Sequence, residues 1–130
     1  MKWKAKILEV GKQAIDPREN IIIMFGNNAT DELMNVSVIQ EFDKDNSLDN
    51  FIFEKGDQVK INDHLYKALG AGRLVADDMK EMGHVTLVFI DQVPEQLMKN
   101  AIYLQKSDEE TIPNFKVNDE IEYIHGEELN

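Results

Sequence analysis

Short stretches in which apolar and polar residues alternate recur along this chain, and they constrain its fold more than any other feature. At the start, Trp3, Ala5 and Ile7 fall on one side of an extended segment, and lysines fall on the other. A period of two residues is typical of a strand with one buried face. Further strands are predicted at residues 21–25, 36–42, 51–53, 58–61, 64–69, 84–89, 101–105 and 117–124. Residues 21–25 are apolar throughout, which predicts burial on both faces.

One segment has helical spacing instead. Val75, Met79 and Met82 recur at intervals of three and four residues, and acidic residues in the first turn suit the positive end of a helix. Gly83 suits the left-handed residue that closes a helix. The sequence therefore predicts a helix over about residues 75–82. Single helical turns are also predicted at residues 30–34, with Asn28 or Thr30 as the cap, and at 94–98.

About eight short strands and one short helix predict a mainly β fold, a small barrel or a barrel-like sandwich. Closure of the sheet would remove the exposed strand edges that invite aggregation. Val85, Leu87 and Phe89 share one face of their predicted strand and are expected in the core. A length of 130 residues, with neither a repeat nor a linker, predicts a single domain over residues 1–130.

Composition excludes several classes of function. The chain has no cysteine, which rules out disulfides, thiolate zinc sites and a cysteine nucleophile. A formal charge of −11 disfavours binding to nucleic acid and anionic membranes. The acidity fits either attraction of a basic partner or simple solubility. No apolar stretch is long enough for a membrane helix, so a cytoplasmic protein is expected.

The three histidines are the side chains that titrate closest to neutral pH. His84 directly follows the helix-closing glycine and faces away from the core, with the Thr86 hydroxyl on the same side. A phosphoryl group carried on an imidazole needs a neutral nitrogen, a partner for the other nitrogen and hydrogen-bond donors, and Thr86 could be one donor. Alternatively, His84 only bonds a loop carbonyl. His64 in a turn and His125 near the chain end are expected to have no catalytic role.

Other sites are not supported by the spacing of residues. No pair of histidines stands at helical ligand spacing, so no metal site is expected. The glycines at positions 70 and 72 lack a full phosphate-loop pattern, and the aspartates after them would repel an anion. Residues 43–46 lack the spacing of a calcium loop, and no acid pair can be singled out for hydrolysis.

The segment from Gly72 to Phe89 resembles the glucitol/sorbitol-specific IIA components of the sugar phosphotransferase system. These proteins carry a close relative of Met82-Gly83-His84-Val85-Thr86-Leu87 after a short acidic helix. Residues 63–66 (Asp-His-Leu-Tyr) and Gly56 follow the order of the same family. The resemblance implies a cytoplasmic phosphocarrier that accepts phosphate on a histidine from the phosphocarrier protein HPr. It would pass the phosphate to the IIB part of a glucitol/sorbitol-type membrane permease made of IIB and IIC components, without a cofactor.

One departure from the family pattern affects the expected site. The resemblance places the family's phosphorylated histidine, in a setting of Ile-His-x-His, at the stretch that here reads Ile39-Gln40-Glu41-Phe42. An amide cannot carry phosphate, so Gln40 would not be a competent acceptor. Two hypotheses remain: a phosphocarrier that uses His84, or a non-catalytic relative that binds or regulates, with Gln40 on a docking face. A third, a barrel that binds nucleic acid or a small ligand, rests on fold alone.

Overall fold

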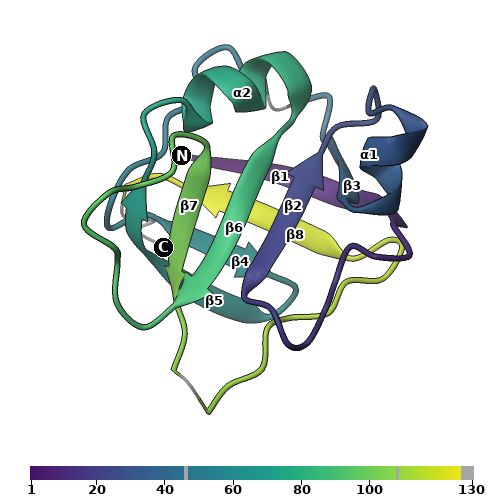
Figure 1. Cartoon of the computed structure of the whole chain (residues 1–130). Coiled ribbons are helices and arrows are strands. Elements are labelled where there is room, and N and C mark those ends of the chain that lie inside the picture. Colours follow the sequence, from purple (N-terminus) through teal and green to yellow (C-terminus); the bar gives the residue numbers. More distant parts are fainter. Residues whose placement is uncertain (46, 108, 127–130) are drawn as a thin grey trace.

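Eight strands form a closed barrel in the computed structural model, which describes residues 1–45, 47–107 and 109–126 (Figure 1). The strands are β1 (Lys2–Val10), β2 (Ile21–Phe25), β3 (Val38–Phe42), β4 (Gln58–Ile61), β5 (His64–Ala71), β6 (Val85–Ile90), β7 (Ala101–Gln105) and β8 (Glu120–Ile124). The helices are α1 (Asp31–Asn35) and α2 (Val75–Met82). The predicted mainly β fold and its main helix are confirmed, and the structure decides between the barrel and the barrel-like sandwich in favour of a closed barrel.

The order of the strands around the barrel differs from their order in the sequence. Its strands run β1-β3-β2-β6-β7-β5-β4-β8 and close from β8 back onto β1. Most neighbours are antiparallel, but β2 pairs with β3, and β6 with β7, in parallel. Figure 1 shows α2 lying across one end of the barrel, where β6 begins.

The alternating residues line the interior as predicted. Trp3, Ala5 and Ile7 of β1 are buried in one continuous core, which also takes in Leu87 and Phe89 of β6. Since successive side chains of a strand point to opposite faces, each barrel strand contributes every second residue to this core. The period of two in the sequence is therefore the signature of the barrel wall.

Residues 51–53 were expected to form a strand and do not. Phe51 and Phe53 are buried and Ile52 is 43% exposed, so the alternation is real, but the segment lies outside the sheet. The reason lies in the topology: β4 already pairs with β5 on one side and β8 on the other. A closed barrel leaves this segment no edge to join.

Three further expectations need correction. The β2 strand was expected to be buried on both faces, yet Ile21 is exposed because the outer face of the barrel meets solvent there. The turn at 94–98 is not helical; the amide of Met98 donates to the Tyr103 hydroxyl instead. The last strand starts only at Glu120, because Asn118 has a positive φ of 77° that no strand accommodates.

The helix ends agree with the capping signals in the sequence. Thr30 caps α1, its hydroxyl accepting a hydrogen bond from the Leu33 amide at 3.3 Å. Gly83 closes α2 in the left-handed conformation with φ 60°. Neither helix in the described residues has the length and apolar character needed to cross a membrane.

Candidate functional site

His84 stands at the junction between α2 and β6, held by the backbone on both sides. The Gly83 amide donates to the Met79 carbonyl at 2.9 Å, and the His84 amide donates to the Asp78 carbonyl at 3.3 Å. A side chain added at Gly83 would press on the backbone of Gly26, so the turn sits tightly against the end of β2. The position of the His84 backbone is thus fixed by a helix end and a strand start.

Both ring nitrogens of His84 have a partner. The Nδ1 atom lies 3.0 Å from the Met24 carbonyl oxygen, and Nε2 lies 2.8 Å from the Asn100 side-chain nitrogen. A carbonyl oxygen can only accept, so Nδ1 carries a proton and donates it. In the neutral ring, Nε2 then has a free lone pair, to which the Asn100 amide donates. The geometry therefore selects the tautomer whose nucleophilic atom is Nε2.

Phe25 orients the same ring. The Phe25 and His84 rings stack with their centroids 4.3 Å apart and their planes 25° from parallel. Both side chains are half-buried. A stacked aromatic face favours a ring that becomes cationic, as an imidazole does when it gains a substituent on its second nitrogen.

Gln40 lies inside the barrel, directly behind this junction. Its side chain is 1% exposed, and its amide nitrogen donates to the Gly83 carbonyl at 2.8 Å. Its amide oxygen accepts a hydrogen bond of 2.8 Å from the Tyr123 hydroxyl. The expectation that Gln40 lies on a docking face is wrong, because position 40 points inward from β3. Gln40 instead links the core to the residue that precedes His84.

The Tyr123 hydroxyl is suited to this role because it stays protonated. Complete burial raises the pKa of Tyr123 well above its usual range, and the hydrogen bond to Gln40 opposes that shift only in part. A phenol with a raised pKa keeps its proton at neutral pH and can donate it to the Gln40 oxygen.

Thr86, the predicted hydrogen-bond donor, shares the outer face of β6 with His84. It is 8% exposed, and its backbone amide donates to the Asn100 carbonyl at 3.0 Å. In the part of the chain that the structure describes, its hydroxyl makes no hydrogen bond to the His84 ring. Thr86 thus positions the backbone of Asn100, while a contact of its hydroxyl with phosphate remains a prediction.

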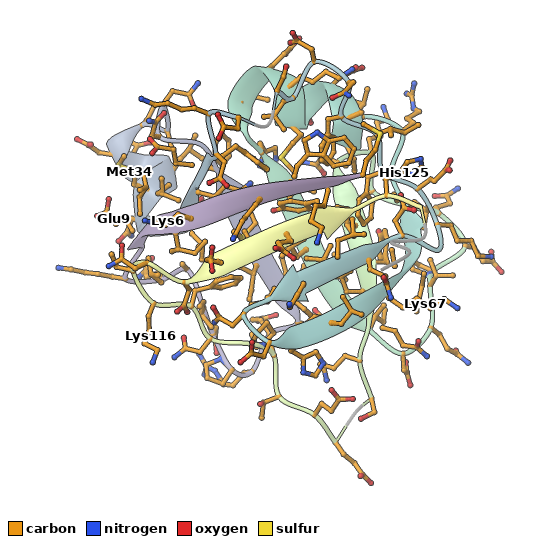
Figure 2. All side chains as sticks on the ribbon, turned by 180° about the vertical axis from the view of Figure 1, so that it is seen from behind. Lys6, Glu9, Met34, Lys67, Lys116 and His125 are labelled. Atoms are coloured by element: carbon orange, nitrogen blue, oxygen red, sulfur yellow. The ribbon has the colours of Figure 1, made fainter. Side chains whose placement is uncertain are left out.

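The other two histidines lie away from this junction. His64 is exposed at the start of β5 and stacks on Tyr66, with centroids 4.1 Å apart. His125 lies beside the ends of β1 and β8 (Figure 2), where its Nδ1 atom is 2.8 Å from the buried Asp57 carboxylate. The structure therefore does not bring the three histidines together into one site.

The turn before β7 places the Asn100 side chain beside the His84 ring. The Leu74 amide donates to the Lys99 carbonyl at 2.8 Å, and the Gly72 amide donates to the Ala101 carbonyl at 2.8 Å. With the Thr86 bond, these contacts pin the backbone on both sides of Asn100. The backbone of Asn100 is therefore held in place, and its side chain extends to the His84 ring.

Replacing Gly72 by alanine is expected to damage this turn. The added Cβ would overlap the carbonyl oxygens of Met98 and Lys99, and main-chain atoms cannot move aside cheaply. We expect a loss of about 3 kcal/mol in the free energy of unfolding, measured by urea denaturation. The control is Gly56→Ala, at which an added Cβ meets open space and only the positive φ of 94° is unfavourable. Equal losses in the two variants would contradict the close approach at Gly72.

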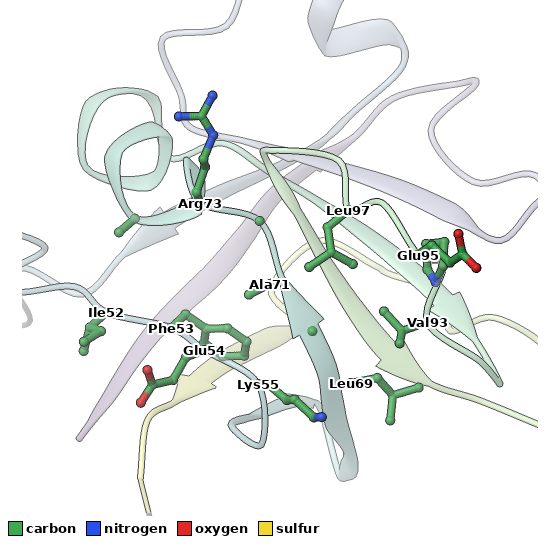
Figure 3. Close-up of a pocket in the computed structure, with 14 residues that line it drawn as sticks. Ile52, Phe53, Glu54, Lys55, Leu69, Ala71, Arg73, Val93, Glu95 and Leu97 are labelled. Carbon is green, nitrogen blue, oxygen red and sulfur yellow. The ribbon is translucent and has the colours of Figure 1, made fainter.

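An apolar hollow of about 470 Å³ lies beside this turn, between α2, the end of β5 and residues 52–55. Val93 and Leu97 line one side and Ile52 the other, while the Arg73 side chain points away from them (Figure 3). His84 is not among its lining residues. The hollow is thus separate from the candidate site.

Sequence reasoning singled out His84 as a candidate but did not predict the residues that contact its ring. Phe25 and the Met24 carbonyl belong to β2, and Asn100 precedes β7, so all three residues lie at least 16 positions from residue 84 in the sequence. Only the pairing of β6 with both strands brings them together. A lone asparagine before a predicted strand carries no signal of this contact, because turns commonly begin with this residue.

Comparisons with known proteins support the sequence resemblance. The chain matches the family model described as "PTS system glucitol/sorbitol-specific IIA component" over residues 2–122. Its structure is similar to the crystal structure of a PTS system IIA component from Enterococcus faecalis V583. The two share 31% sequence identity with a TM-score of 0.82, over 94% of this chain and 99% of the other. A comparison with curated proteins gives no match.

Proposed function

Because this chain belongs to the family of glucitol/sorbitol-specific IIA components of the phosphotransferase system, we propose that it carries a phosphoryl group on His84. The group comes from the phosphohistidine of HPr and passes to the IIB part of a glucitol/sorbitol-type permease. This role places the protein in the cytoplasm, and it requires no metal or organic cofactor. We also propose that residues 1–130 act as a single domain.

The observation that carries the proposal is the tautomer of the His84 ring, which has its proton on Nδ1. Its Nδ1 atom donates to the Met24 carbonyl at 3.0 Å, which leaves Nε2 as the neutral nucleophile. Phosphoryl transfer between two nitrogens depends on positioning and charge stabilisation more than on acid–base catalysis. A ring fixed by a main-chain carbonyl and an aromatic face supplies that positioning.

The transfer forms one nitrogen–phosphorus bond and breaks another. The Nε2 lone pair attacks phosphorus, the nitrogen–phosphorus bond of the HPr histidine breaks, and its electron pair stays on the HPr ring. His84 keeps its Nδ1 proton, so its ring becomes cationic and the Met24 carbonyl stabilises the charge. The Phe25 face adds to this stabilisation.

Incubation with phosphoenolpyruvate, the first phosphotransferase enzyme and HPr tests the proposal. We expect the intact mass to rise by one phosphoryl group that is lost in acid, because phosphohistidine is acid-labile. The same mixture without HPr is the control and should give no increase. A chain that takes up no phosphate while an active IIA component in the same mixture is labelled would contradict the proposal.

A second candidate function is favoured by the burial of Gln40. The family resemblance places the phosphorylated histidine at this position. In this chain the position holds a neutral amide that is 1% exposed and whose nitrogen and oxygen both have hydrogen-bond partners. Such a chain could keep the fold as a binding or regulatory module of the phosphotransferase system. Absence of phosphate in the experiment above would favour this alternative.

A further inference from the structure

We propose that Asn100 is the positioning residue of this site: its side-chain amide holds the Nε2 lone pair of His84 and then donates to the incoming phosphoryl group. The inference rests on the proposed role of His84. Its basis is the 2.8 Å contact between the Asn100 side-chain nitrogen and His84 Nε2.

Asn100 is the donor in this hydrogen bond, because the contact at the other ring nitrogen, Nδ1, leaves Nε2 as an acceptor. The Met24 carbonyl can only accept, which places a proton on Nδ1 and leaves Nε2 without one in the neutral ring. An amide oxygen facing Nε2 would then be repelled by the lone pair. Asn100 must therefore present its NH₂ group, whose second hydrogen is available for another acceptor.

The surroundings allow the amide to change partners. The backbone near Asn100 is fixed through the Thr86 amide and through the Lys99 carbonyl, to which Leu74 donates. The side chain is half-buried rather than packed into the core. Rotation about its own bonds can thus release Nε2 without moving the barrel.

During the transfer, the amide hydrogen bond moves from one acceptor to another. Nε2 needs its lone pair to form the bond to phosphorus, so the Asn100 NH₂ must leave it. The phosphoryl oxygens arrive at the same place and are strong acceptors of charge-assisted hydrogen bonds. No proton is transferred, since Asn100 donates a hydrogen bond throughout. A donor that is already in place needs little reorganisation during the reaction.

A small phosphoryl donor separates this role from the recognition of HPr. With phosphoramidate, the Nε2 lone pair attacks phosphorus, the phosphorus–nitrogen bond breaks, and ammonia leaves with the electron pair. We expect this reagent to label His84 of the wild-type protein. Asn100→Ala should react about tenfold more slowly, the factor that one hydrogen bond to a charged group supplies.

The Asn100→Asp variant distinguishes hydrogen bonding from packing. It keeps the size and shape of the side chain but replaces the NH₂ donor with a charged acceptor that repels phosphate. We expect it to react at least as slowly as Asn100→Ala. Long-range ¹H–¹⁵N spectra, assigned with His84→Ala, should show a proton on Nδ1 alone in neutral wild-type His84 and a second one on Nε2 in Asn100→Asp. The matched control is Asn27→Ala, which removes an exposed amide that contacts Glu41.

Different results would overturn the role of Asn100 and the role of HPr as the phosphoryl donor. Wild-type rates with phosphoramidate in both Asn100 variants would overturn the role of Asn100, as would a wild-type ring protonated on Nε2 and not on Nδ1. Failure of phosphoramidate to label His84 at all would overturn it too. Labelling by phosphoramidate without labelling by HPr would leave Asn100 as the positioning residue and reject HPr as the donor.

Discussion

Substitution of His84 by alanine is expected to abolish phosphate uptake from HPr, a loss of at least about a hundredfold. The reason is that the proposed acceptor atom is removed, and neither of the other histidines lies at this junction. His64 is exposed on β5, and His125 is held against Asp57. The measurement is intact mass after incubation with phosphoenolpyruvate, the first phosphotransferase enzyme and HPr.

Two controls show whether the loss reflects chemistry. His64→Ala removes an exposed imidazole and should be labelled like the wild type. His84→Asn keeps an N–H group that can donate to the Met24 carbonyl in place of Nδ1, so it should fold yet accept no phosphate. Labelling that survives His84→Ala would reject this histidine as the acceptor, even though phosphocarrier function itself would stand.

Replacement of Gln40 by alanine is expected to lower the free energy of unfolding by about 4 kcal/mol. The change leaves the Tyr123 hydroxyl and the Gly83 carbonyl without their partner inside the barrel, and it opens a cavity. For a chain of this length, such a loss lowers the melting temperature by about 10–15 °C. Urea denaturation and thermal melting followed by circular dichroism measure both effects.

The matched control is Gln13→Ala, which removes an exposed amide that accepts a hydrogen bond from Asn35. It should change the free energy of unfolding by about 0.5 kcal/mol or less. A similar, small loss in Gln40→Ala would contradict the buried network.

A double-mutant cycle isolates the hydrogen bond between Gln40 and Tyr123. Gln40→Met keeps most of the side-chain volume but leaves the Tyr123 hydroxyl without a partner. Tyr123→Phe leaves the Gln40 amide oxygen without a partner. Since removing both partners leaves no unpaired atom of this bond, the double variant should be more stable than the sum predicts by about 1–3 kcal/mol. Additive losses would show that the two side chains do not depend on each other. This cycle also gives an answer if Gln40→Ala fails to fold.

The local elements could be predicted from the sequence because their signals are local. The period of two at Trp3, Ala5 and Ile7 marks one barrel wall, and the spacing of Val75 and Met79 with Gly83 after them defines α2. The errors arose where pairing partners decide the outcome. Residues 51–53 alternate like a strand, but the closed order of strands leaves them outside the sheet.

The sequence by itself determined the family, the mainly β class, the core face of β6 and the location of His84 after a helix end. These features depend on residues close together in the chain, and alternation, capping and motif spacing record them directly. Only the tertiary structure decided what surrounds His84 and that Gln40 is buried. The contacts with Met24, Phe25 and Asn100 form because β6 lies between β2 and β7. That arrangement is set by the packing of the whole barrel, and no short stretch of sequence encodes it.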